Sequence, residues 1–224
     1  MTASTAPDLK DQLVQAARLL FQTGVMSHSG HGNMSARLPG TEQMLLTSGG
    51  TIAQLTAEEL AVVSFDGDVV EGALLPVTRE IVAMHAGIYR ERPDALAVIH
   101  THSPHVTSFA LAAKPLPCAY EAMLRFGITE DIPVADWAPR GSPESVANIA
   151  EQLRRHPTVS AVLLANHGLL AFSRDPLAAA QLVVVMEEAA EMTLRARALG
   201  GEHPFPADAL DQERQHMQRF GSAR

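Results

Sequence analysis

The stretch Ala97-Val98-Ile99-His100-Thr101-His102 decides how the rest of the chain is interpreted. It is a short apolar run, typical of a β-strand, that ends in the pattern His-x-His. Residues two apart on a strand point to the same face, so His100 and His102 present two imidazoles side by side where a buried strand ends. The pair suits a metal ion, although a pattern this short also occurs as two ordinary polar residues at a strand end. A third ligand elsewhere in the chain would favour the metal.

A second apolar run supplies a candidate for that third ligand. Residues 159–165 read as a buried strand that ends in Asn166-His167-Gly168, and residues 169–172 read as the next strand. His167 therefore has the same kind of setting as His100 and His102, at the end of an apolar strand. The three histidines together form a candidate metal site.

Composition limits the class of protein. The chain has 224 residues, of which 46% are hydrophobic, so residues 1–224 are long enough for one domain with a large core. A net charge of −8 without a basic block favours a small-molecule substrate over nucleic acid. Cys118 is the single cysteine, which excludes an internal disulfide, and no apolar run is long enough to span a bilayer. These features, with no basic and apolar leader at the N-terminus, favour the cytoplasm.

Two glycine-containing turns are candidate anion-binding sites. Gly32 and Asn33 lie in a segment rich in Gly, Ser and His, and Thr47, Ser48 and Gly49 follow an apolar strand. Small residues let backbone N–H groups approach an anion, and the Asn, Thr and Ser side chains add donors. Plain glycine turns remain the alternative interpretation.

Candidate proton-transfer groups occur in two places. Glu80 lies near the start of a helix predicted over 76–92, where a carboxylate can also serve only as a partner of the helix dipole. His85, on the apolar face of that helix, reads as a core histidine. Tyr120 and Glu121 end an extended connection and put a phenol beside a carboxylate.

The remaining pattern predicts alternating helices and strands. The first third is predicted to be mostly antiparallel sheet, with a hairpin over 62–70. Further helices are predicted over 7–23, 106–113, from Ser142, over 175–199 and through Met217 and Phe220.

Five motifs, in this order and spacing, resemble those of the class II aldolase/adducin family: Gly32-Asn33-Met34-Ser35, Leu46-Thr47-Ser48-Gly49, Arg92-Pro93-Asp94, His100-Thr101-His102 and Asn166-His167-Gly168. The resemblance covers nearly the whole chain. It implies an α/β fold of the α/β/α three-layer type, with a central mostly antiparallel sheet flanked by helices. It also implies zinc on His100, His102 and His167, and a homotetramer with sites between subunits.

The activity that the resemblance implies is zinc-dependent retro-aldol cleavage of a ketose phosphate or a related hydroxy-ketone. Three neutral imidazoles leave a coordination position open for substrate, and zinc as a Lewis acid stabilises an enediolate without a Schiff-base lysine. Neither Lys10 nor Lys114 occurs in a motif. A dehydratase or decarboxylase on the same metal site is one alternative. A non-enzymatic interaction module like that of adducin is another, which the intact histidine set disfavours.

The resemblance also assigns roles to single residues. Glu80 is the nearest equivalent of the family's proton-moving glutamate, offset by one residue, and Tyr120 or Glu121 would act at the leaving oxygen. Gly49 and Val77 stand where the aldolases use hydroxyl residues in their phosphate site, which leaves the donors Asn33, Thr47, Ser48 and Thr78. Arg79 or Arg125 would instead pair with a substrate carboxylate.

Overall fold

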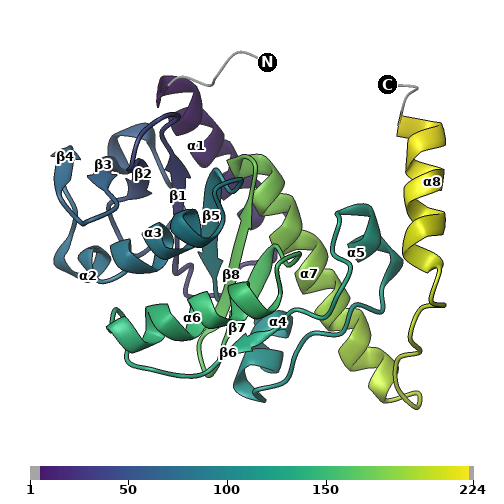
Figure 1. Cartoon of the computed structure of the whole chain (residues 1–224). Helices are drawn as coiled ribbons and strands as arrows, with labels where there is room; N and C mark the ends of the chain where they lie inside the picture. The colour runs from purple at the N-terminus through teal and green to yellow at the C-terminus, as the bar shows by residue number, and fades with distance from the viewer. Residues whose placement is uncertain (1–5, 222–224) are drawn as a thin grey trace.

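The computed structural model describes residues 6–221, and an eight-stranded sheet forms its centre (Figure 1). The strands lie in the order β4-β3-β2-β1-β5-β8-β7-β6. Their bounds are β1 Gly32–Arg37, β2 Gln43–Thr47, β3 Leu60–Ser64, β4 Val69–Glu71, β5 Ala97–Thr101, β6 Val134–Ala135, β7 Ala161–Leu164 and β8 Gly168–Ser173.

Every strand pair in this sheet is antiparallel except β6 with β7. The predicted histidine strand, β5, lies in the middle between β1 and β8, and the predicted antiparallel first third is β1 to β4. The sequence-based expectation of a mostly antiparallel central sheet is confirmed.

Helices cover both faces of the sheet. Helices α1 (Ala6–Gln22), α4 (Pro104–Leu111) and α7 (Pro176–Arg197) pack on one face, and α3 (Val82–Glu91) and α6 (Pro143–Arg155) pack on the other. Two separate cores result, one on each side of the sheet, which confirms the three-layer arrangement. The short elements η1 (Ala57–Glu59), α2 (Pro76–Arg79), α5 (Glu121–Arg125) and the C-terminal α8 (Ala209–Gly221) complete the described chain.

The alternation along β5 decides which layer the histidines face. Ala97 and Ile99 belong to the core under α1, α4 and α7, whereas Val98 belongs to the core under α3 and α6. Because successive strand residues point to opposite faces, His100 points with Val98 toward the α3 and α6 layer. The metal site therefore belongs to that side of the sheet.

The predicted single helix over 76–92 is wrong in one respect, because it is interrupted at Glu80 and Ile81 between α2 and α3. In a continuous helix the Ile81 N–H would donate to the Val77 carbonyl. That carbonyl instead accepts from Arg140 Nη2 at 2.9 Å, and the Ile81 N–H donates to Thr78 O at 3.2 Å. A contact with a residue some sixty positions away thus breaks the helix at Glu80.

None of the helices within residues 6–221 is both long enough and apolar enough to cross a bilayer.

Candidate metal centre and its cavity

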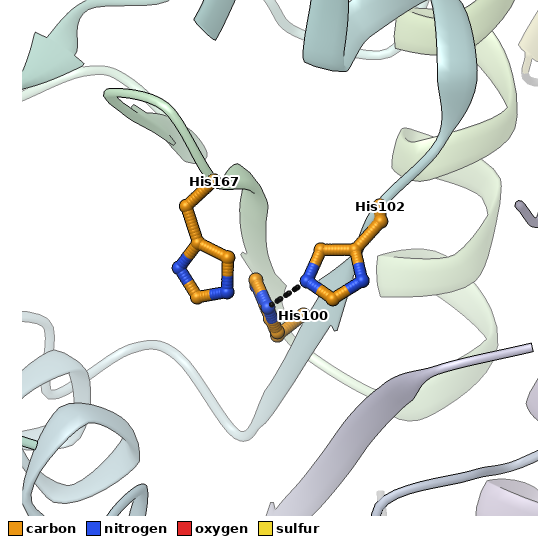
Figure 2. A group of neighbouring side chains, drawn as sticks. All are labelled: His100, His102 and His167. Carbon is orange, nitrogen blue, oxygen red and sulfur yellow. Dashed lines mark hydrogen bonds between the residues drawn. The ribbon is translucent and has the colours of Figure 1, made fainter. Parts of the chain in front are cut away.

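Three histidines converge at the ends of β5 and of the β7–β8 turn (Figure 2). One ring nitrogen from each of His100, His102 and His167 lies within 4.8 Å of the others, and His100 Nε2 is 3.1 Å from His102 Nε2. Two nitrogens bound to one tetrahedral zinc at 2.0–2.1 Å lie roughly 3.3 Å apart. The spacing of the pair therefore fits shared coordination of a metal ion.

The hydrogen bond behind His100 fixes which nitrogen is the donor to a metal. His100 Nδ1 is 2.9 Å from the backbone carbonyl oxygen of Leu169, and a carbonyl can only accept, so Nδ1 carries the hydrogen. In the neutral ring the lone pair then lies on Nε2, which faces the other histidines. A backbone acceptor behind a metal-ligating imidazole is a common way to set its tautomer and orientation.

Burial keeps these imidazoles neutral. Burial, followed by the nearby histidines, lowers the pKa of His100 well below its ordinary value. Burial first, then the charges of His31 and Arg140, lowers the pKa of His102, and burial, His102 and Arg140 lower that of His167 to about 4. Neutral imidazole is the form that binds metals, so the donor set is ready at neutral pH. The chemistry of the site fits a divalent ion.

Two glycines let the neighbouring strands approach the histidine strand. A Cβ atom at Gly168 would lie 2.5 Å from the Thr101 carbonyl oxygen and 2.9 Å from His102 Cδ2. A Cβ atom at Gly32 would lie 2.8 Å from the His100 carbonyl oxygen. Both distances are shorter than real Cβ contacts, so these positions require glycine for packing against β5.

Two further residues hold the turns that carry the ligands. Asn166 takes a left-handed conformation, with φ of 58°, that asparagine tolerates better than most residues and that turns the chain into His167. On the other side, Glu187 of α7 accepts from the backbone N–H groups of His105 and Val106, at 2.8 and 2.9 Å. This buried carboxylate caps α4 and fixes the segment that leaves His102.

A cavity of about 630 Å³ opens beside the histidines. Glu80 lines it, as the sequence-based hypothesis requires, and its carboxylate lies 3.8 Å from Arg140 Nε. Gly141 packs directly against Glu80, and its φ of 73° is one that glycine adopts without strain. The lining also includes large apolar side chains: Val77, Ile81, Met84, Trp137, Val146 and Ile149.

The predicted anion-binding residues separate into two groups. Gly32 and Asn33 line the cavity, and Asn33 is paired across the strands with His100. The others do not line the described cavity: Thr47, Ser48, Gly49, Thr78 and Arg79.

The two threonine hydroxyl groups in that second group already stabilise the fold. Thr47 Oγ1 accepts from the Met34 N–H at 3.2 Å, and Thr78 Oγ1 donates to the Ser48 carbonyl at 2.9 Å. Both threonines are buried. Their role in binding an anion stays a prediction.

Tyr120 and Glu121 lie away from this cavity in the single chain. They begin α5, which packs against α7 and α8, and Glu121 pairs with Arg125 one helical turn on. The negative charge of Glu188 raises the pKa of the Tyr120 phenol. Their catalytic role also stays a prediction.

Sequence reasoning missed the importance of residues that act only through tertiary contacts. Glu187 and Trp137 gave no local signal, and Arg140 lies in irregular sequence that predicts no contact with Glu80 or Val77. His85 was correctly predicted as a buried histidine, but its polar partners were not predicted. A helix-breaking or capping role at such long range has no periodic pattern by which it can be found.

An antiparallel-rich sheet between two helix layers, with three histidines converging beside a cavity, defines a metal-binding α/β protein. A family model described as Class II Aldolase and Adducin N-terminal domain matches residues 11–194. The chain belongs to this family, as the sequence motifs indicated.

Proteins similar in sequence include an aldolase and a decarboxylase. A 5-methylthioribulose-1-phosphate/5-deoxyribulose-1-phosphate aldolase of Rhodospirillum rubrum is 30% identical over 218 residues, covering 95% of this chain and 92% of the relative. A 3-oxo-tetronate 4-phosphate decarboxylase of Haemophilus influenzae is 31% identical over 192 residues, covering 82% and 85%.

A solved structure of an L-fuculose 1-phosphate aldolase superposes on this fold with a TM-score of 0.82. It is 28% identical, and the match covers 96% of this chain and 98% of that one. The expectations of a class II aldolase fold and of an enzyme of the class II aldolase type are confirmed.

Proposed function

We propose that this protein is a zinc-dependent aldolase that cleaves a ketose phosphate or a related hydroxy-ketone. The observation that carries the proposal is the set of three neutral imidazoles converging beside a cavity that Glu80 also lines. The names of the aldolase relatives, which are sugar-phosphate enzymes, support the same substrate class.

His100, His102 and His167 would hold the ion. Three nitrogen ligands and an open position suit zinc in a catalytic site. When bound there, zinc supplies Lewis-acid polarisation of a substrate carbonyl. The chain's own part is to keep the three rings neutral and correctly oriented, through burial and through the Leu169 carbonyl.

Side chains of the protein carry out the proton transfers. Aldol cleavage breaks the bond between the carbon next to the carbonyl and the carbon bearing the hydroxyl group. The hydroxyl proton leaves as the aldehyde forms, and the electron pair stays with the other fragment until a proton is returned to its carbon. We assign that return to Glu80, because it lines the cavity and its carboxylate pairs with Arg140 there.

The hydroxyl proton needs an acceptor of its own. The Glu121 carboxylate takes this role, or Tyr120 hydrogen-bonds to the leaving oxygen, only from a neighbouring copy of the chain, since both lie away from their own cavity. The proposal therefore includes the homotetramer with sites between subunits that the family resemblance implies, working in the cytoplasm.

Decarboxylation of a phosphorylated 3-oxo acid is the second candidate. The 31% identity with the Haemophilus influenzae decarboxylase favours it, and the same metal site would polarise the oxo group while carbon dioxide leaves. Arg140 beside the cavity offers a guanidinium partner for a carboxylate.

Product analysis separates the two reactions. The zinc-loaded protein is incubated with a panel of ketose 1-phosphates and of 3-oxo 4-phospho acids, and aldehydes and carbon dioxide are both quantified. Aldehyde release that stops on chelation and returns with zinc supports the proposal, whereas carbon dioxide release supports the second candidate. Activity that survives replacement of all three histidines refutes both.

A further inference from the structure

A continuous line of buried polar side chains runs from the cavity into the core under α3. Asn33 Oδ1 is 2.6 Å from His85 Nε2, His85 Nδ1 is 2.7 Å from Ser35 Oγ, and Ser35 Oγ is 2.7 Å from Tyr89 Oη. All four side chains are at most 6% exposed. Four polar side chains sealed in an apolar layer are costly unless each bond in the line is made.

The line has one consistent direction. The Asn33 oxygen only accepts, so His85 Nε2 carries a hydrogen. Burial lowers the pKa of His85 to about 3, so the ring is neutral, and its bare Nδ1 accepts from the Ser35 hydroxyl. Ser35 has then used its hydrogen and accepts from the Tyr89 hydroxyl.

The near end of the line opens onto the cavity. With Oδ1 held by His85, the Asn33 amide nitrogen points away from that ring, and Asn33 lines the cavity opposite His100. Among residues 6–221 no hydrogen bond engages this nitrogen, and it is not one of the sealed polar atoms that lack a partner, so it is accessible. Its two hydrogens are therefore available to a ligand beside the histidines.

We propose that His85, Ser35 and Tyr89 are positioning residues that hold the Asn33 amide with its N–H donors toward the cavity, and so make this position select an anionic or carbonyl oxygen. The inference rests on the proposed use of this cavity as the substrate site. The three residues act only through Asn33 and do not touch the ligand.

The ring of His85 gives the first test. Nitrogen-15 NMR of the zinc-loaded protein, labelled at histidine, distinguishes the two neutral tautomers. The hydrogen on Nε2 is expected between pH 5 and 8. The hydrogen on Nδ1 would overturn the proposal, because every bond in the line would then be reversed and Asn33 would present its oxygen.

Binding of inorganic phosphate to the zinc-loaded protein gives the second test. His85→Leu removes the ring that holds the Asn33 side-chain oxygen. The affinity for phosphate is therefore expected to fall about tenfold, while the zinc content stays unchanged. His85→Gln, which keeps one donor and one acceptor, is expected to restore most of it. In a protein that already carries Asn33→Ala, adding His85→Leu should not lower the phosphate affinity further.

An equal loss of affinity in the Asn33→Ala background would overturn the positioning role, since the effect would then not pass through Asn33. If His85→Leu does not fold, the phosphate affinity of Tyr89→Phe and the His85 tautomer measurement still test the proposal. Neither test needs turnover, so a failure of the proposed function and a failure of this inference are distinguishable. With a substrate in hand, His85→Leu should raise KM more than it lowers kcat.

Discussion

The candidate metal-binding histidines and the candidate proton-transfer groups are held by the fold in different ways. His100, His102 and His167 stand on strand ends and a tight turn, where backbone pairing with β1 and β8 fixes them. Glu80 stands at a helix interruption, and Glu121 at an exposed position on a short helix. The first group depends on local strand geometry, and the second depends on distant side chains and, in our proposal, on another copy of the chain.

The largest effect is expected at the histidines. Replacing His100 with Ala removes a ligand whose ring is buried and oriented, so zinc content should fall to background and activity by at least about 10³-fold. Elemental analysis of the purified protein and product assays measure both. His28→Ala, at an exposed histidine away from the site, serves as the matched control and should keep both. Stoichiometric zinc in His100→Ala would contradict the assignment.

Replacing Glu80 with Gln tests the proton-transfer side. The change should keep zinc bound but lower kcat by about 10²- to 10³-fold, the range expected for loss of general acid–base catalysis. Steady-state kinetics are compared with those of Glu58→Gln, a matched control on the exposed face of η1. If Glu121→Gln loses as much as Glu80→Gln, both groups take part and a neighbouring copy completes the site. A normal kcat in Glu80→Gln would remove Glu80 from the mechanism.

The strand geometry can be disturbed without touching a ligand. A methyl group at Gly168 would overlap the Thr101 carbonyl, so Gly168→Ala should push β8 away from β5 and weaken zinc binding by roughly 10- to 100-fold. Zinc affinity is measured by competition with a chelator of known affinity. Gly49→Ala is the control for zinc binding, because the nearest atom to its added methyl group is 4.0 Å away. Equal zinc affinity in Gly168→Ala and the wild type would show that the close approach is not needed.

The change expected to affect activity least is a pH dependence of stability that arises at His85. The folded state holds its pKa near 3, whereas the unfolded chain has the ordinary value of 6.5, so the unfolded state binds the proton first as the pH falls. Stability should decrease below pH 6.5 by up to about 1.4 kcal/mol per pH unit until the folded pKa is reached. Urea unfolding from pH 7 to pH 4 measures it.

The comparison protein for that experiment is His85→Gln, which does not titrate. Its free energy of unfolding should fall less steeply over the same range, by the share that His85 contributes. Parallel slopes in the two proteins would mean that the buried line from Asn33 to Tyr89 does not hold His85 neutral.

Several features could be predicted because they are local. The apolar runs in 97–102, 159–165 and 169–172 predicted three strands, and the period of two put His100 and His102 on one face. The motifs predicted the family, the three-layer fold and the histidine set. The glycines were noticed as well, but Gly32 and Gly168 pack against β5, a reason that only the strand register reveals.

The interruption at Glu80 shows what could not be predicted. The sequence from Pro76 to Arg92 is compatible with one helix, and it is Arg140, from the segment before α6, that takes the Val77 carbonyl. Likewise, the sequence suggested that Thr47 and Thr78 bind an anion, whereas in the fold their hydroxyl groups hydrogen-bond to the backbone of neighbouring segments.

By itself, the sequence determined the strands, the pairing of imidazoles on one face and the family, because these follow from side-chain periodicity and short motifs along the chain. Only the tertiary structure decided which residues share the cavity, how Glu80 is exposed to it, and which way the Asn33 amide points. These depend on contacts between segments far apart in the chain. The physical reason is that a hydrogen bond depends on where both of its partners lie, whereas a pattern along one segment describes only one of them.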